Sequence, residues 1–449
     1  MPILVSLPST IAQNGTGVSG IIGSDRTWVS TGSPYNLTGN ILVNNGVTLT
    51  VGSGSTINLN GFYIMVNGSL AIQQGVTINM ENANAYILVN GAFSAVGTST
   101  NPIQINGNMG SITEFGPVYY SRITFSTSSI GWNQATNSGS IIENAVVNLT
   151  EIDVSSSVKM HSDTFVGGEL SVTGGSPLIY ESAISNLVYI KGGSCSLTNN
   201  RIIGGFILYS GGDTTTIADN IISHSQSVSG FRDGIWFSGD QGKNLLIQNN
   251  LITDNTYGIQ IFSPNLDNIP TASIIQNNTI TNNTIGIYVS NSYVPTIINN
   301  NIENNTLSVK LVADYSGHSR GFDVSNNWWG TTDLQAINAS IYDFKNDFNL
   351  GMVTFVPILT VQNPQATPNL VFVPTPTPSP TPSISTSPTQ TPSISPSKSP
   401  SPTTTPASTP AVPEFPSLIS LPLIVIAILL TVLLIRKEKS HIDLSHHSQ

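Results

Sequence analysis

The chain has 449 residues, with 14 Lys plus Arg against 24 Asp plus Glu, and charged residues make up only 8% of it. The formal net charge of −10 argues against nucleic acid as a partner, because DNA and RNA binding needs basic patches. So little charge also argues against a cytosolic surface. A surface rich in Asn, Ser, Thr and Gly suits contact with glycans.

The N-terminus is apolar but short. Met1 to Leu7 lacks a basic region, and Thr10-Ile11-Ala12 resembles the end of a cleavable leader. We expect residues 1–13 to be a truncated signal peptide, with the true start lying upstream of Met1. The stalk and anchor described below require export.

The first half of the chain contains loose repeats. Gly46-Val-Thr-Leu49 returns as Gly75-Val-Thr-Ile78, and Val66-Asn67-Gly68 returns 23 residues later as Val89-Asn90-Gly91. Residues 111–185 show alternation without a clear phrase, and we assign them to the same structure by continuity only.

Between residues 197 and 330 one phrase occurs six times: an aliphatic residue, a spacer, two Asn-type positions, a spacer and a large apolar residue. The copies begin at Leu197, Ile217, Ile247, Ile275, Ile297 and Val324. Their second Asn falls at Asn200, Asn220, Asn250, Asn278, Asn300 and Asn327, in steps of 20, 30, 28, 22 and 27 residues. Such a period is typical of a solenoid.

A second column, after Gly205, Gly234, Gly258 and Gly286, alternates apolar and other residues in the manner of short strands. Strands without a helix in the repeat predict a parallel β-helix over residues 14–359, with roughly 13 coils of about 23 residues. Asn tolerates left-handed corners, and its amide can bond to the amide one coil above. We expect the apolar residue of each phrase to stack inside, with Cys195 in or near that wall; these residues are Ile202, Ile222, Ile252, Ile280 and Ile302.

These repeats resemble those of right-handed β-helix proteins, the superfamily of pectate lyases and of periplasmic copper-site maturation proteins. The end of the array resembles the closing coil of archaeal surface β-helix proteins. There we expect Trp328, Trp329 and a short helix starting near Thr332 to cover the last coil, with Leu334, Ile337 and Ile341 on one face. The alternative for the Trp pair is a sugar-binding platform.

Residues 360–412 are expected to form a disordered stalk, because the stretch from Pro374 to Ala411 is almost wholly Pro, Thr and Ser. Fully extended, that stretch spans about 120 Å at roughly 3.1 Å per residue. The uncharged stretch from Leu418 to Ile435 is long enough to cross a bilayer. The positive-inside rule then places residues 440–449 in the cytoplasm and the bulk of the chain outside the cell. The stop-transfer cluster consists of Arg436, Lys437 and Lys439.

Just before the span stands Pro413-Glu414-Phe415. This motif, the apolar helix and the basic cluster, together residues 413–439, resemble the archaeal PEF-type C-terminal sorting signal. The resemblance implies a sortase-like processing enzyme as a partner. The alternative is a plain membrane anchor, because ten residues follow the basic cluster.

Several Asn-X-Ser/Thr sequons are candidate N-glycosylation sites, although a chain so rich in Asn, Ser and Thr contains them by composition alone. We expect Asn277 to be occupied by packing. The candidates are Asn36, Asn67, Asn148, Asn282, Asn304 and Asn338.

The best candidate catalytic cluster lies on the longest coils, where extra loops are expected. Enzymes of the β-helix superfamily use several carboxylates, with Ca²⁺ and a basic residue or as acid–base pairs. The candidates here are Arg232, Asp233 and Asp254, together with Asp240, Lys243 and Asp267. However, no two acidic residues of the repeats are expected to recur in the same column on consecutive coils. His224, Asp254 and Asn282 share a column that would ligate a metal incompletely, and His161 and His318 have no partner at ligand spacing.

The sequence therefore favours a non-enzymatic protein, anchored in the membrane at the cell surface, for adhesion, envelope structure or glycan binding. No metal or cofactor is expected. Polysaccharides and other surface proteins are the expected partners. The alternative is an anchored polysaccharide lyase or glycoside hydrolase acting around Arg232, Asp233 and Asp254. Copper delivery, as in the maturation relatives, is the least favoured hypothesis because one cysteine and scattered histidines form no soft-ligand cluster.

Overall fold

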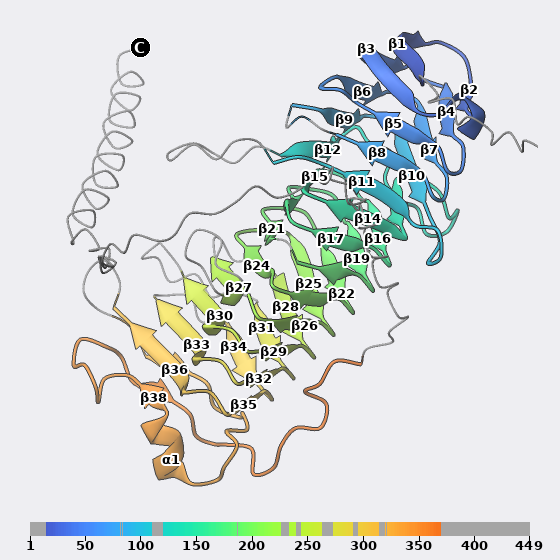
Figure 1. Cartoon of the computed structure of the whole chain (residues 1–449). Helices are drawn as coiled ribbons and strands as arrows, with labels where there is room; N and C mark the ends of the chain where they lie inside the picture. Colours follow the sequence, from blue (N-terminus) through green and yellow to red (C-terminus); the bar gives the residue numbers. More distant parts are fainter. Residues whose placement is uncertain are drawn as a thin grey trace, which may run out of the picture. The chain divides into compact units, whose positions relative to one another are not determined.

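A computed structural model describes residues 15–369, apart from 81, 83, 110–119, 186, 226–232, 239–243, 263–272, 291–294, 314–318 and 320. The described chain is a parallel β-helix in which each coil lays short strands on three faces (Figure 1). On these faces the described strands pair in parallel with the strands of the neighbouring coils. The predicted all-β solenoid is thus confirmed.

Face 1 is the 12-stranded sheet. Its strands are β2 (Arg26–Trp28), β4 (Thr48–Val51), β7 (Ser69–Ile72), β10 (Ala92–Val96), β13 (Ile141–Glu143), β16 (Lys159–His161), β19 (Leu178–Tyr180), β22 (Ser196–Thr198), β25 (Thr214–Ala218), β28 (Asn244–Gln248), β31 (Ile274–Gln276) and β34 (Thr296–Ile298).

Faces 2 and 3 belong to one 25-stranded sheet, because β1 (Thr16–Ile22) and the long β3 (Tyr35–Val43) join them. The strands of face 2 are β5 (Thr56–Asn58), β8 (Thr77–Asn79), β11 (Ile103–Asn106), β14 (Ala145–Asn148), β17 (Thr164–Val166), β20 (Ala183–Ile184), β23 (Arg201–Ile203), β26 (Ile221–Ser223), β29 (Leu251–Thr253), β32 (Thr279–Thr281) and β35 (Asn301–Glu303).

The strands of face 3 are β6 (Tyr63–Val66), β9 (Tyr86–Val89), β12 (Ser121–Phe125), β15 (Thr150–Val154), β18 (Glu169–Val172), β21 (Leu187–Ile190), β24 (Phe206–Tyr209), β27 (Asp233–Ser238), β30 (Tyr257–Phe262), β33 (Ile285–Ser290), β36 (Leu307–Val312) and β38 (Ile341–Tyr342). A short 3₁₀ turn, η1 (Ser30–Gly32), precedes β3, and β37 (Phe322–Asp323) pairs with β39 (Val353–Thr354).

The core is the stack of inward side chains from the three faces. On face 2, Ile252 pairs with Ile222 on one side and Ile280 on the other, and all three side chains are fully buried. Side chains alternate between the two sides of each strand, so the residues next to these buried ones face outward. Cys195 is buried in the same interior, as expected, and this burial raises the pKa of its thiol to about 12.

The two residues of the repeated Asn pair have different structural roles. The first residue takes the left-handed corner, as Asn249 does at φ 54° and Asn277 at φ 53°. The second forms an asparagine ladder inside the corner, in which each Nδ2 donates to the Oδ1 of the next coil at 2.9–3.1 Å. The ladder consists of Asn200, Asn220, Asn250, Asn278, Asn300 and Asn327.

The end of the solenoid is covered largely as predicted. Asp333 caps the helix α1 (Leu334–Ala339) by accepting a hydrogen bond from the Gln335 backbone, and Ile337 and Ile341 are buried. The expectation for Leu334 is wrong: its side chain is 49% exposed, because it stands at the first, solvent-facing turn of α1. Trp329 is buried and Trp328 donates from Nε1 to Glu303 at 3.0 Å, which fits capping.

Residues 359–369, which we call the return segment, pack against the outside of the corner between faces 1 and 2. Asn363 donates to the Asn277 side chain at 3.0 Å and exchanges hydrogen bonds with Asn301. Farther along, the Asn369 backbone donates to Asp219 at 3.2 Å. The chain therefore runs back over several coils, and packed structure extends past residue 359, where the sequence analysis ends the β-helix domain.

No helix within the described residues combines the length and apolarity needed to cross a bilayer. The predicted leader, sorting motif, span and basic cluster lie outside the described residues, as does the predicted stalk from residue 370 onward.

Candidate functional site

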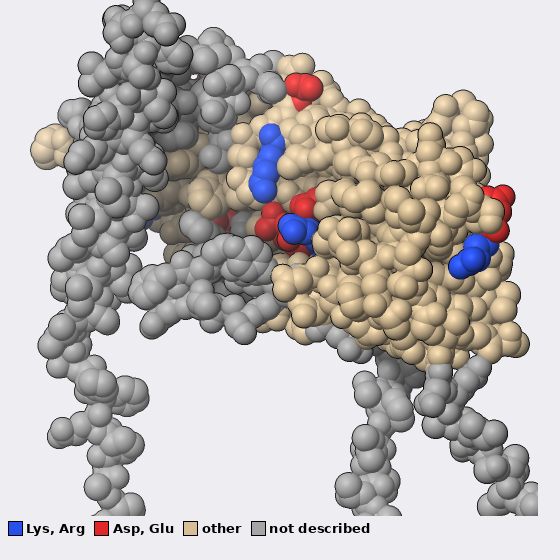
Figure 2. All heavy atoms as spheres, turned by 90° about the horizontal axis from the view of Figure 1, so that it is seen from above, with Lys and Arg blue, Asp and Glu red and all other residues tan. Residues whose placement is uncertain are grey.

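Charged side chains are sparse on the described surface, and Figure 2 shows that those on the side it presents gather in a few small groups. The most populated group among the described contacts lies on the outside of face 3, over β12, β15, β18 and β21. We call it the charged cluster; it consists of Arg122, Glu151, Asp153, Glu169 and Lys191.

Strand alternation places these side chains outside. In β15 the buried Ile152 and Val154 alternate with the half-buried Glu151 and Asp153. Backbone register then aligns them with neighbouring coils, since Glu151 pairs with Arg122 and Asp153 pairs with Ser171. Continuing the β15–β18 register by one residue sets Glu151 opposite Glu169.

The pKa of both glutamates in the cluster is raised. Burial, the nearby charges of Asp153 and Glu169, and a hydrogen bond to Asp153 raise the pKa of Glu151 to about 7, against the opposing effect of Arg122. Burial also raises the pKa of Glu169, which Lys191 partly offsets. The raised pKa allows Glu151 to keep a proton near neutral pH, and its O–H can then donate to the Asp153 side chain.

Cations and hydroxyls hold the ends of the cluster. Lys191 Nζ lies 3.8 Å from Glu169, donates to the Ser171 hydroxyl at 3.3 Å and lies 4.0 Å from the Tyr189 ring centre. At the other side, Thr124 donates to Asp153 at 3.3 Å.

An aromatic pair continues the same column toward the N-terminus. Tyr86 pairs with Arg122 across the strands and stacks on Tyr63, with ring centres 4.8 Å apart and planes at 13°. The Arg122 guanidinium lies 5.9 Å from the Tyr86 ring centre. With strands about 4.8 Å apart, the column from Tyr63 to Glu169 extends roughly 19 Å along face 3.

The cluster combines acidic and basic side chains, and its Glu151 carboxyl can hold a proton near neutral pH. No group of three or more His, Cys, Asp or Glu side chains in the described part of the chain is arranged to hold a metal ion. A carboxyl with a pKa near 7 beside ionised carboxylates is instead the arrangement that general acid–base chemistry uses.

The cluster predicted from the sequence is only partly visible. Arg232, Asp240, Lys243 and Asp267 lie outside the described residues. Asp233 begins β27 fully buried, and burial raises its pKa to about 7; neither of its carboxylate oxygens is hydrogen-bonded to a described residue. Asp254 lies in an exposed left-handed corner and accepts a hydrogen bond from Thr253 at 2.9 Å. Within the described contacts the two carboxylates share no hydrogen bond or ion pair, so a joint role stays a prediction.

One statement from the sequence is wrong: acidic residues do recur in one column on consecutive coils, at Glu151 and Glu169. His161 also has two carboxylate neighbours, since its ring nitrogens lie 3.5 Å from Glu143 and 3.0 Å from Glu181. Both relationships were hidden for one reason: the coils here are only 18 to 20 residues long and lack the Asn phrase, so the strand register was not visible in the sequence.

The sequon asparagines differ in whether their side-chain amides are hydrogen-bonded within the protein. Asn36 and Asn148 belong to a second row of bonded amides on face 2, with Asn58, Asn79 and Asn106 between them. Asn67 is exposed and accepts a hydrogen bond from Asn90. Asn277 is engaged by Asn363, as its expected role in packing implies. The remaining three are exposed: Asn282, Asn304 and Asn338.

Residues 170–329 match the family model described as "Right handed beta helix region". No curated protein and no solved structure matches the chain. The matched repeats and the parallel sheets together show that this chain carries a right-handed parallel β-helix.

Proposed function

We propose that this protein is anchored at the cell surface and binds glycans along face 3 of its β-helix. The observation that carries the proposal is the single column of stacked tyrosines, guanidinium and carboxyl groups from Tyr63 to Glu169. Aromatic faces pack against sugar rings, and fixed charged groups bond to hydroxyls.

Cell-surface anchoring rests on sequence alone. The Pro/Ser/Thr stalk, the apolar stretch and the basic cluster Arg436, Lys437 and Lys439 occur in the order that a C-terminal anchor requires. The Pro413-Glu414-Phe415 motif supports processing by a sortase-like enzyme. The anchor is tested by fractionating cells that express the full chain. We expect the protein to be recovered with the membranes and to be released from intact cells by protease. Recovery in the cytosol would contradict it.

Binding is tested by titrating the full-length protein with neutral and uronic-acid polysaccharides. We expect binding that weakens at least tenfold in Tyr86→Ala and in Arg122→Ala. These variants remove the aromatic and the cationic part of the column, while the buried alternation of β9 and β12 stays intact. Unchanged affinity in both variants would contradict binding on face 3.

A second candidate function is glycoside cleavage at the charged cluster, and the pKa of Glu151 near 7 favours it. A protonated Glu151 can give its proton to the leaving-group oxygen. Asp153 or Glu169 can then act as the general base that takes a proton from the attacking water. The alternative site around Arg232, Asp233 and Asp254 shows no such pair of interacting carboxyl groups within the described contacts.

Product analysis separates binding from cleavage. If the protein cleaves glycans, Glu151→Gln abolishes product formation while binding persists, and activity falls as the pH rises above about 7 because Glu151 loses its proton. If wild-type protein binds a polysaccharide without shortening it, the non-enzymatic function holds.

A further inference from the structure

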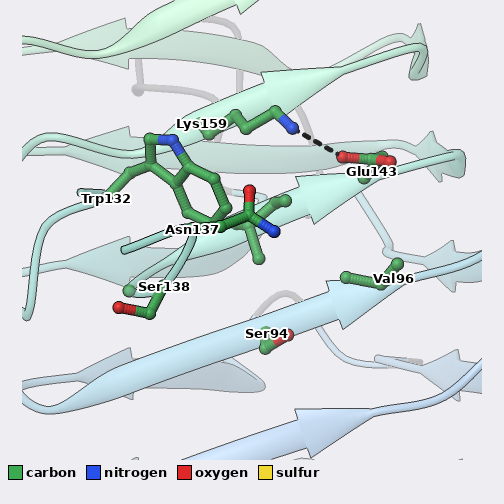
Figure 3. Close-up of a pocket in the computed structure, with 9 residues that line it drawn as sticks. Ser94, Val96, Trp132, Asn137, Ser138, Glu143 and Lys159 are labelled. Atoms are coloured by element: carbon green, nitrogen blue, oxygen red, sulfur yellow. Dashed lines mark hydrogen bonds and ion pairs between the residues drawn. The ribbon is translucent and has the colours of Figure 1, made fainter. Parts of the chain in front are cut away.

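A cavity of about 500 Å³ lies on face 1, away from the strands that bear the charged cluster (Figure 3). Its floor is formed by outward residues of β10, β13 and β16, among them Ser94, Glu143 and Lys159. Its wall is the connection between β12 and β13, which carries Trp132, Asn137 and Ser138. Aromatic and polar groups therefore converge on one depression of the surface.

The wall is held in place at both ends. Ser140 donates to the Ile130 carbonyl from its backbone at 3.0 Å and from its hydroxyl at 2.7 Å, which closes the base of the connection. Asn133 and Ser138 exchange backbone hydrogen bonds at 2.7 and 3.3 Å. The Trp132 backbone donates to the Ser157 carbonyl of the next coil. The backbone that carries Trp132 is thus fixed by these hydrogen bonds.

The charges beside the indole are paired and partly buried. Lys159 Nζ lies 2.8 Å from Glu143 and 4.9 Å from the centre of the Trp132 ring, with 15% of its side chain exposed. His161 lies between Glu143 and Glu181 and stacks on Tyr180 at 4.4 Å. A charged ligand would have to compete with this network, whereas hydroxyl groups can bond to it without breaking it.

We propose that this cavity binds a single neutral sugar ring of a glycan. The indole of Trp132 packs against the apolar face of the ring, Glu143 accepts from its hydroxyls, and Lys159 and the side chains of Asn137 and Ser138 supply donors. The ligand class rests on the proposed glycan-binding function, but the site is separate from the column on face 3.

The test is a calorimetric titration of the full-length protein with neutral oligosaccharides and, separately, with uronic-acid oligosaccharides, with the indole emission of the wild type recorded in parallel. We expect neutral sugars to change the indole emission, and Trp132→Ala and Glu143→Gln each to weaken neutral-sugar binding at least tenfold. Glu143→Gln keeps the side-chain shape, so it stays informative if Trp132→Ala misfolds. Thr216→Ala, in the same outward column of face 1 but outside the cavity, is the control and leaves affinity unchanged.

The outcomes separate this inference from the proposed function. If neutral sugars bind Trp132→Ala and Glu143→Gln as well as wild type while Tyr86→Ala loses binding, the cavity is not the site and the function of face 3 stands. If the cavity variants lose neutral-sugar binding and Tyr86→Ala does not, the cavity is the binding site and the proposed binding on face 3 is wrong. Binding of uronic-acid sugars alone overturns the neutral-ring inference.

Discussion

Asn220 binds Asn250 twice: its backbone N–H and its side-chain Nδ2 both donate to Asn250 Oδ1, each at 2.9 Å. Asn250 repeats the same arrangement with Asn278. The ladder therefore satisfies the buried backbone donors of the corner as well as its own amides, which explains why this position is Asn in consecutive coils.

We predict that Asn250→Ala destabilises the protein by about 2–4 kcal/mol, because two buried donors of Asn220 lose their acceptor. Urea unfolding, together with protease cleavage near the altered corner, measures this. The neighbouring Asn249→Gly is the matched control and should cost less than about 1 kcal/mol, since glycine also adopts the left-handed corner. Equal losses in both variants would show that the ladder contributes nothing beyond the corner.

Ile252→Asp places a carboxylate between Ile222 and Ile280 in the fully buried stack. We expect a loss of several kcal/mol in stability, with new protease cleavage confined to residues 220–280 because each coil contacts only its neighbours. Asp254→Asn, in an exposed corner two residues away, should cost less than about 0.5 kcal/mol. If Asp254→Asn cost more stability than Ile252→Asp, the assignment of Ile252 to the interior and of Asp254 to the surface would be wrong.

These two columns follow from sequence because the repeat phrase is regular there: the Ile stack and the Asn ladder are confirmed residue by residue. In residues 141–200 the ladder position is Asp163, then Ser182, before Asn200 appears. Without that marker the strands could not be aligned. A signal was present, because Glu151 and Glu169 are 18 residues apart, as are Glu143 and His161, and equal steps place them in shared columns.

The cavity on face 1 was harder to foresee. Trp132 belongs to a connection without the repeat, and its position depends on backbone hydrogen bonds to Ile130 and Ser157 that no side-chain pattern encodes. The return segment was hidden for a similar reason: it lacks the repeat phrase, and its contacts with the solenoid, such as those of Asn363 and Asn369, are visible only in the structure.

Asp233 should make stability depend on pH. Burial raises the pKa of its carboxyl to about 7 from the ordinary 3.8, so between these values the folded protein keeps a proton that the unfolded chain has released. The stability from this group is complete at low pH and falls as the pH rises to about 7, by about 1.4 kcal/mol per pH unit at most.

We therefore predict that Asp233→Asn stabilises the protein at pH 8 and has little effect at pH 4, as measured by urea unfolding at both values. Asp254→Asn, which changes an exposed carboxylate, should give the same small effect at both. A pH dependence that survives in Asp233→Asn would assign it to another group, such as the buried Asp163, whose pKa burial also raises.

The return segment should detach when its central contact is removed. Asn363→Ala deletes the hydrogen bonds to Asn277 and to the Asn299 carbonyl, which we expect to cost about 1–3 kcal/mol. Hydrogen exchange should then accelerate in residues 359–369 while the solenoid stays protected. Gln365→Ala, an exposed neighbour, is the control and should leave exchange unchanged. Uniformly faster exchange throughout the solenoid would contradict a locally attached segment.

The most direct test of glycan binding on face 3 compares two tyrosine pairs on that face, one stacked at 13° and one tilted at 42°. Tyr63 and Tyr86 lie beside the charged cluster with ring centres 4.8 Å apart, and Tyr257 and Tyr288 lie several coils away at 4.7 Å. Calorimetric titration of the full-length protein with a bound polysaccharide should give at least tenfold weaker affinity for Tyr86→Ala and wild-type affinity for Tyr288→Ala. Equal affinity of Tyr86→Ala and wild type would contradict the account.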